Sequence, residues 1–250
     1  MISIAVFNLK GGCGKTTTVI NLAAALTSMK KRVLVIDMDG QANLTESMGL
    51  TKDEPQTVYG AIHGPHPLPV VSTPCGIDVV PSCLDLSAAE SELLHEPGRE
   101  LILKGLVDEA VDRSRYDYLL VDCPPMLGLL TLNALTLADY LIIPVQAEYL
   151  AMRGMAKILS SVQVVKQRLN ARLQVAGILL TMFDRRKTLH KTVSETIRES
   201  FGSQVFRTVI RCNVALAEAP VQGKSVIEYS PRSYGAEDYL SLAREVLSLK

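Results

Sequence analysis

Short apolar runs alternate with longer amphipathic stretches along almost the whole chain of 250 residues. The runs are rich in Val, Ile and Leu without strict alternation, which is typical of parallel strands that are buried on both faces. We predict strands at Ile2–Phe7, Arg32–Ile36, Ile77–Pro81, Tyr118–Asp122, Tyr140–Val145, Gln174–Thr181 and Val205–Ile210. The stretches between them predict helices at Thr16–Met29, Glu100–Ser114, Leu129–Ala138, Leu150–Leu169, Thr188–Phe201 and Ala236–Leu249.

This order of elements predicts an α/β fold, a doubly wound and mostly parallel sheet with helices on both faces and right-handed crossovers. We expect residues 1–250 to form a single domain, because a chain of this length can bury one large core and no internal repeat divides it. The proline-rich stretch Thr51–Thr73 is interpreted as a loop within that domain.

Composition excludes several classes of protein. The 26 Lys and Arg residues balance the 26 Asp and Glu residues, so no overall charge draws the chain to nucleic acid or acidic lipid. The longest apolar stretch, Met126–Ala138, is too short to span a bilayer, and the N-terminus lacks the basic region of a signal peptide. Five cysteines without a CxxC pair disfavour a disulfide framework or a zinc site, so we expect a cytoplasmic location.

A glycine-rich segment, residues 10–17, joins the first predicted strand to the first predicted helix. Glycines let backbone N–H groups close around phosphate oxygens, and the helix N-terminus adds its dipole. In such a loop Lys15 reaches the β- and γ-phosphates, and the Thr16 hydroxyl ligates Mg²⁺. The strict phosphate-loop pattern requires a glycine where Leu9 stands, and a second lysine follows it instead. The predicted nucleotide-binding residues are Lys10, Gly11, Gly12, Cys13, Gly14, Lys15, Thr16 and Thr17.

This pattern, Lys-Gly-Gly-x-Gly-Lys-Thr-Thr, resembles the deviant Walker A motif of the ParA/MinD family of P-loop ATPases. The resemblance implies ATP and Mg²⁺ as cofactors and a P-loop NTPase fold. It also implies that Lys10 crosses a dimer interface and touches the nucleotide held by the partner subunit. A cation supplied in this way neutralises charge on the transferred phosphoryl group and couples ATP binding to dimerisation.

The ends of two other predicted strands carry acidic motifs. Asp37-Met-Asp39-Gly40-Gln-Ala-Asn resembles the second phosphate-side motif of the family, in which Pro is usual where this chain has Gly40. The resemblance implies that Asp39 orients or activates the attacking water and that Asp37 lies near the magnesium shell. The predicted strand Tyr118–Asp122 ends in an aspartate, which is the Walker B arrangement, and Asp122 is therefore expected to hold Mg²⁺ through water. We therefore predict Lys10, Lys15 and Asp39 as catalytic residues and Thr16, Asp37 and Asp122 as metal residues.

The resemblance covers nearly the whole chain, and it is strongest to the small, chromosomal-type (Soj-like) ParA proteins. MinD-type relatives end in a basic amphipathic membrane helix, whereas this chain stops directly after its last predicted helix, so we expect no membrane partner. Larger plasmid ParA proteins carry an N-terminal helix-turn-helix domain, and only nine residues precede Lys10 here. Biosynthetic P-loop enzymes of the dethiobiotin synthase and cobyrinate synthase type share the fold, and a lysine at position 10 does not exclude them.

Basic residues concentrate in one part of the chain. Residues 151–213 hold twelve Lys or Arg and three Asp or Glu, a net charge of +9, so the remainder carries −9. Such asymmetry is typical of a surface that contacts the phosphate backbone of nucleic acid, and an ordinary solvated helix face is the alternative. The resemblance aligns Arg186 with a family position implicated in nonspecific DNA binding, whereas Ala215 replaces a second such arginine. The candidate DNA-binding residues are Arg186, Lys187, Lys191 and Arg211.

These motifs predict an ATPase that forms a homodimer with ATP sandwiched between its subunits. In that state it is expected to bind DNA without sequence preference and to drive partition of a chromosome or plasmid. A ParB-like partner is expected to stimulate hydrolysis, and the location is expected to be cytoplasmic and nucleoid-associated. A MinD-like positioning ATPase and a P-loop biosynthetic enzyme stay open as alternatives.

Overall fold

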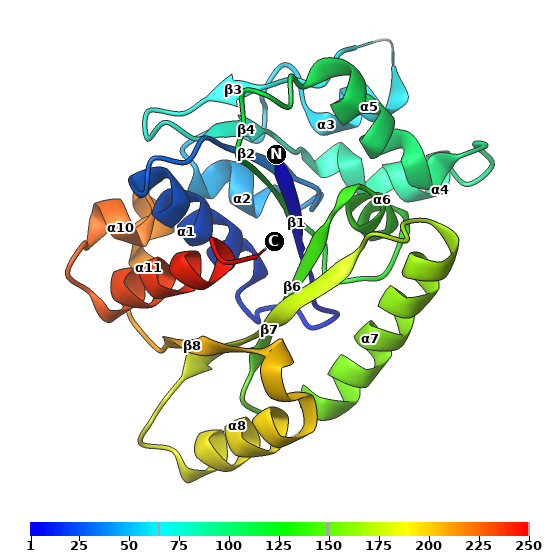
Figure 1. The fold of residues 1–250 in the computed structure, drawn as a ribbon. Coiled ribbons are helices and arrows are strands. Elements are labelled where there is room, and N and C mark those ends of the chain that lie inside the picture. The colour runs from blue at the N-terminus through cyan, green and yellow to red at the C-terminus, as the bar shows by residue number, and fades with distance from the viewer. Residues whose placement is uncertain (65, 149–150, 250) are drawn as a thin grey trace.

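The computed structural model describes residues 1–64, 66–148 and 151–249, and within them eight strands form one sheet in the order β3-β4-β2-β5-β1-β6-β7-β8 (Figure 1). The strands are β1 (Ile2–Val6), β2 (Val33–Asp37), β3 (Val71–Ser72), β4 (Asp78–Val80), β5 (Tyr118–Asp122), β6 (Tyr140–Gln146), β7 (Gln174–Phe183) and β8 (Val205–Arg211). The β3–β4 pair is antiparallel and every other pair is parallel. The predicted doubly wound, mostly parallel sheet is therefore confirmed.

Long and short helices connect these strands. The longer ones are α1 (Lys15–Ser28), α5 (Ile102–Ala110), α6 (Leu129–Leu137), α7 (Ala151–Arg168), α8 (Thr188–Phe201) and α11 (Tyr234–Val246). The short ones are α2 (Asn43–Ser47), α3 (Val58–His63), α4 (Ala89–Glu92), α9 (Ala215–Glu218) and α10 (Val226–Tyr229). Single 3-10 turns form η1 (Leu84–Ala88), η2 (Arg99–Leu101), η3 (Gly202–Gln204) and η4 (Ala219–Gln222).

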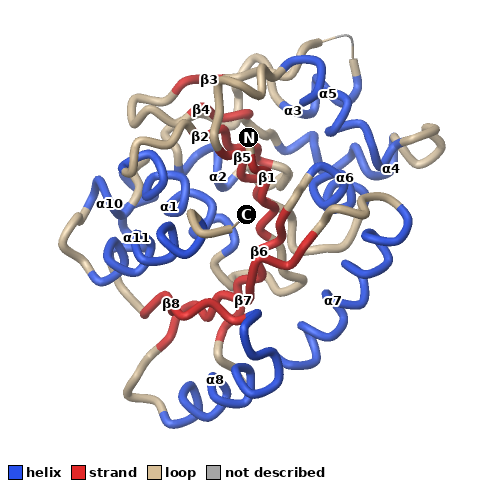
Figure 2. Tube along the Cα trace, viewed as in Figure 1, coloured by secondary structure: helices blue, strands red, loops and turns tan. Residues whose placement is uncertain are grey.

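Helices cover both faces of the sheet, as Figure 2 shows with α1, α10 and α11 on one side and α5, α6 and α7 on the other. Successive side chains of a strand point to opposite faces, so each central strand contributes to two cores. In β1, Ile4 and Val6 pack in the core beneath α1 and α11, whereas Ala5, and Phe7 directly after the strand, pack in the core beneath α5, α6 and α7. This double burial explains why the strands are continuously apolar in sequence.

Every predicted strand is present, with ends shifted by two residues at most. The predicted helix Glu100–Ser114 is shorter in the structure, because η2 replaces its first turn and α5 ends at Ala110. Beyond α5 the Asp112 carboxylate accepts a hydrogen bond from the backbone N–H of Ser114, a local turn that competes with the helix. Leu150, the first residue of another predicted helix, lies outside the described residues.

The interpretation of Thr51–Thr73 as a loop is wrong in two places, because α3 and β3 lie within it. Helix α3 buries Val58 and Ala61 in the core, and β3 pairs with β4 at the edge of the sheet. A six-residue helix and a two-residue strand are too short to show a hydrophobic period in the sequence. The prolines of this stretch are then the main signal, and they predict a loop.

The carboxyl ends of the parallel strands meet along one edge of the sheet. Strand β1 lies between β5 and β6, so the chain leaves it at the point where the strand order reverses. Open α/β sheets bind ligands at such a point. Asp37 ends β2, Asp122 ends β5, and the glycine-rich segment follows β1, so the topology brings all three predicted motifs to this edge. Among the residues that the structure describes, no helix has the length and apolarity needed to cross a membrane.

Candidate functional site

The glycine-rich segment forms a tight loop between β1 and α1. Gly12 and Gly14 have φ angles of 70° and 88°, in the left-handed region that favours glycine. Two carbonyl oxygens of the loop are fixed by neighbouring strands. Gln146 Nε2 donates to the carbonyl of Gly12 at 3.0 Å, and Thr181 Oγ1 donates to the carbonyl of Cys13 at 2.8 Å. The loop is therefore held in shape by β6 and β7, which sequence patterns did not reveal.

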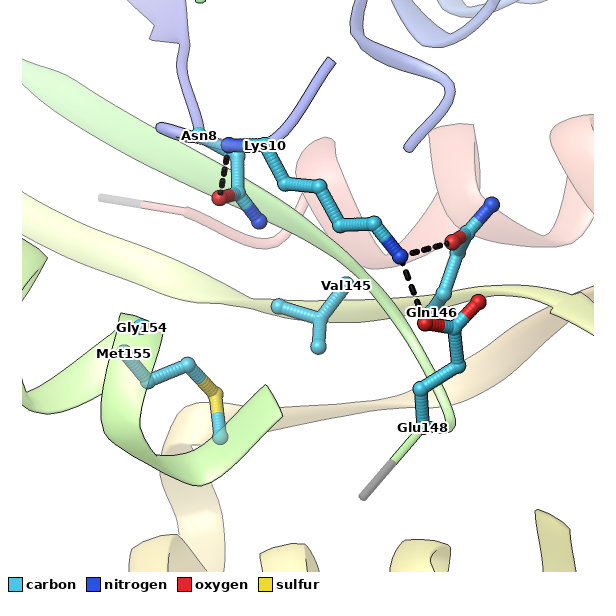
Figure 3. A pocket seen from close by; sticks show the side chains of 7 residues that line it. All are labelled: Asn8, Lys10, Val145, Gln146, Glu148, Gly154 and Met155. Atoms are coloured by element: carbon cyan, nitrogen blue, oxygen red, sulfur yellow. Dashed lines mark hydrogen bonds and ion pairs between the residues drawn. The ribbon is translucent and has the colours of Figure 1, made fainter. Parts of the chain in front are cut away.

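The two lysines of the loop have different surroundings. Lys15 is buried, and its Nζ donates to the carbonyl oxygen of Lys10 at 3.1 Å, so its ammonium group lies against the loop itself. The Lys10 side chain is exposed, and its Nζ contacts Gln146 Oε1 at 2.7 Å and Glu148 Oε2 at 2.6 Å (Figure 3). Lys10 is thus paired within its own subunit, and contact with a second subunit requires this ion pair to break.

Thr16 and Asp122, two of the predicted metal residues, meet at the start of α1. Thr16 Oγ1 donates to Asp122 Oδ2 at 2.7 Å. The other oxygen, Asp122 Oδ1, is buried and has no hydrogen-bond partner among the described residues. Burial raises the pKa of Asp122 well above its usual range, and the nearby charge of Asp37 adds to the effect. Mg²⁺ takes hard oxygen ligands and needs only one or two from the protein, so this pair fits magnesium.

Asp37 lies beside Asp122, because the two residues are partners in the parallel β2–β5 register. Its oxygens already have protein donors: Oδ2 accepts from the N–H and hydroxyl of Thr45, at 3.0 and 2.7 Å, and Oδ1 accepts from the N–H of Asp39 at 3.1 Å. Burial raises the pKa of Asp37 to about 6. The structure therefore gives Asp37 a part in fixing the Asp39 loop, and its predicted place near the magnesium shell stays a prediction.

Asp39 and Gly40 follow in that loop. Asp39 is partly exposed, and its Oδ1 accepts a hydrogen bond from the N–H of Gln41 at 3.0 Å. Gly40 is buried against η1, where an added Cβ would lie 2.8 Å from the backbone nitrogen of Ser87. The proline that is usual in the family would need η1 to move. Gly40, which replaces the usual proline of the family, therefore allows η1 to pack closely against this loop.

A cavity of about 190 Å³ adjoins the start of α1. It is lined by Gly14, Thr17, Thr181, Met182, Asn213 and Leu216, among others. Its mixed apolar and polar lining, directly beside the phosphate loop, suits the base of a bound nucleotide. The segment Asn213–Pro220 contributes to it, although in sequence that segment served only to distinguish family branches.

Three of the four candidate DNA-binding residues lie together between β7 and the first turn of α8. Arg186, Lys187 and Lys191 are all exposed, and Arg186 leaves 90% of its side chain in solvent. Its guanidinium group makes two bonds of 3.0 Å to the Asp184 carboxylate, which lower the pKa of Asp184 to about 2. The local positive charge is therefore partly offset, while the basic side chains stay accessible.

Arg211, the fourth candidate, has different surroundings. Its side chain is only 19% exposed and makes ion pairs with Asp238 at 2.6 Å and Glu237 at 2.7 Å. Its guanidinium group also lies 4.2 Å from the centre of the Tyr234 ring. These contacts join the end of β8 to α11, and they assign Arg211 a structural role that its sequence position did not indicate.

Comparison with known proteins agrees with these motifs. A family model described as an AAA domain matches residues 1–175. The chain is 46% identical over 247 residues to the sporulation initiation inhibitor protein Soj of Bacillus subtilis, covering 97% of both chains. It is 43% identical over 248 residues to the chromosome partitioning protein ParA of Myxococcus xanthus, covering 98% of this chain and 87% of that one.

Two solved structures resemble the fold. A cobyrinic acid a,c-diamide synthase from Mycobacterium smegmatis, with a bound ATP analogue and magnesium, superposes with a TM-score of 0.87 at 35% identity and covers 99% of this chain and 94% of that one. The septum site-determining protein MinD of Pyrococcus horikoshii has a TM-score of 0.81 at 24% identity, covers 99% and 96% of the two chains, and supports the fold alone. With its phosphate loop, its Walker B aspartate and these relatives, the chain belongs to the ParA/Soj family of P-loop ATPases.

Proposed function

We propose that this chain is a partition ATPase that binds ATP and Mg²⁺, dimerises in the ATP state and then binds DNA without sequence preference. The observation that carries the nucleotide part is the Thr16–Asp122 pair at the start of α1, where a buried carboxylate oxygen has no partner among the described residues. The names of the relatives, chromosome partitioning protein ParA and Soj, support the cellular role.

In the proposed site each residue type has a distinct task. The backbone N–H groups of the loop and the N-terminus of α1 bind phosphate oxygens. Lys15 places its ammonium group beside the loop and stabilises charge on the β- and γ-phosphates. Thr16 and Asp122 would hold magnesium, which would supply positive charge against the charge that develops during phosphoryl transfer. Asp39, in the loop that follows β2, orients the attacking water.

Dimerisation would engage Lys10. Its Nζ is exposed, and the Glu148 carboxylate that holds it is also exposed, so the pair is weak and can exchange for another anion. A triphosphate on a second copy of the chain is such an anion. This exchange would make the nucleotide part of the subunit interface, because ADP lacks the phosphate whose charge Lys10 would meet.

DNA binding would use the exposed cluster Arg186, Lys187 and Lys191. We leave Arg211 out of this surface, because its charge is already paired with Asp238 and Glu237. Two clusters aligned by the dimer would contact more phosphates than one, so affinity for DNA should depend on ATP. A cytoplasmic, nucleoid-associated location and a ParB-like stimulating partner belong to the same proposal.

The experiment replaces Arg186 and Lys187 together by Glu and measures DNA affinity with ATP across salt concentrations. With about four phosphate contacts per dimer, the wild-type slope of log affinity against log salt should be near −3.6. The double variant should bind unrelated sequences equally weakly and hydrolyse ATP normally without DNA. The control is Lys30→Glu with Lys31→Glu. It makes the same charge change between α1 and β2, at the amino ends of the parallel strands. Full DNA affinity in the Arg186/Lys187 variant would contradict the proposed surface.

A biosynthetic P-loop enzyme is the second candidate, and the 35% identity to a cobyrinic acid a,c-diamide synthase favours it specifically. The higher identities to Soj and ParA outweigh it. An amide-forming enzyme would hydrolyse ATP in step with an added carboxylic acid and ammonia or glutamine, and would ignore DNA. Co-sedimentation with DNA and with liposomes separates the partition role from the MinD-like alternative.

A further inference from the structure

A buried hydrogen-bond network surrounds the backbone of Asp39. Its N–H donates to Asp37 Oδ1 at 3.1 Å, and its carbonyl oxygen accepts from Ser82 Oγ at 2.8 Å. The carbonyl also accepts from the N–H of Ala42 at 2.9 Å, which closes the turn. Both sides of the Asp39 backbone are therefore held by other residues, while its carboxylate stays partly exposed.

Thr45 connects the two halves of this network. Its hydroxyl donates to Asp37 Oδ2 at 2.7 Å and accepts from the N–H of Ser82 at 2.9 Å. Asp37, Thr45 and Ser82 have no exposed surface. A hydrogen bond in such surroundings is strong, and an unpaired donor is costly, so the network has one well-defined arrangement.

The network joins segments that are distant in sequence. Asp37 ends β2, Thr45 lies in α2, and Ser82 follows β4, the next strand of the sheet. Ser82 is itself fixed in place, because the carbonyl of its neighbour Pro81 accepts from the N–H of Val58 at 2.8 Å at the start of α3. The end of β4 thus acts as a fixed support for the loop that carries Asp39.

We propose that Ser82 and Thr45 are positioning residues that hold Asp39 in its catalytic orientation. The inference rests on the proposed role of Asp39 in hydrolysis, and it extends the site to two hydroxyls that lie outside the phosphate loop and the Thr16–Asp122 pair. Their loss loosens the Asp39 loop and leaves the phosphate loop, Thr16 and Asp122 in place. Nucleotide binding is therefore preserved while the chemical step slows.

The test compares Ser82→Ala, Thr45→Val and Thr45→Ser. Single-turnover hydrolysis at saturating ATP should slow about 10-fold in Ser82→Ala and Thr45→Val, because the water-orienting group is less well held. The dissociation constant for ATP should not change. Thr45→Ser keeps the hydroxyl and should restore most of the rate. Ser82→Ala and Thr45→Val remove different members of one network, so either variant that folds decides the question.

Thr73→Val is the matched control at the opposite end of β4. The Thr73 hydroxyl is also buried, and it donates to the carbonyl of Ile77 at 2.7 Å. Its loss should lower the melting temperature without slowing hydrolysis. Equal hydrolysis rates in Thr73→Val, Ser82→Ala and Thr45→Val would overturn the positioning role.

Asp39→Ala, measured in parallel, separates this inference from the proposed function. If Asp39→Ala stops hydrolysis while Ser82→Ala and Thr45→Val keep the wild-type rate, Asp39 keeps its role and the positioning role falls. If Asp39→Ala hydrolyses ATP normally, the role of Asp39 falls and the positioning roles fall with it.

Discussion

The phosphate loop, residues 10–17, and the basic segment, residues 184–191, both follow strands of the same sheet, yet they are fixed in different ways. The loop is bonded to residues more than a hundred positions away, through Thr16 to Asp122 and through Cys13 to Thr181. The bonds of the basic segment are local, as in the Asp184–Arg186 ion pair, whose partners are two residues apart.

Because of this difference, the phosphate loop is preformed in the single chain, whereas the basic segment depends on a binding partner. Long-range bonds give the loop one shape before any ligand arrives, so its chemistry can be inferred from a single chain. The contacts of the exposed basic segment are local, and in the proposed function this segment acts only through contact with the phosphates of DNA. A substitution in the phosphate loop should therefore abolish nucleotide binding, whereas a substitution in the basic segment should only reduce the affinity for DNA.

Lys15→Ala should have the largest effect. Removal of the buried ammonium group should weaken ATP binding about 100-fold or more, since a charged hydrogen-bonding group facing the phosphates is lost. Isothermal titration with ATP and Mg²⁺ measures it. Lys10→Ala is the matched control in the same loop, and it should keep the ATP affinity of the monomer because Lys10 faces Glu148. Unchanged ATP affinity in Lys15→Ala would contradict the assignment of residues 10–17 as a phosphate-binding loop.

A smaller effect distinguishes Arg211 from Arg186. Arg211→Ala leaves the buried Asp238 carboxylate without its side-chain partner, so the free energy of unfolding should fall by about 2 kcal/mol. Arg186→Ala removes an exposed side chain and should leave stability unchanged while weakening DNA binding. Urea denaturation of both variants measures the contrast. Equal stability of the two would show that the Arg211 ion pairs contribute nothing measurable.

Sequence patterns predicted the loop and the central strands well, because Gly12, Gly14 and Lys15 follow from local backbone and charge requirements. They did not predict Gln146, Thr181, Thr45 or Ser82, whose roles depend on which strands become neighbours. The surroundings of Arg211 were missed for the same reason. A count of charges groups it with Arg186, but its ion-pair partners, Glu237 and Asp238, lie on α11. The short helix α3 was missed because its six residues include Gly60 and lie within the proline-rich stretch Thr51–Thr73.

The central claim is that the nucleotide state of this loop controls self-association, and Asp39→Ala tests it most directly. This variant should bind ATP without hydrolysing it, so sedimentation velocity should show a dimer with ATP and Mg²⁺ and a monomer with ADP and Mg²⁺. A monomer in both conditions, at ATP concentrations that saturate the site, would contradict the claim.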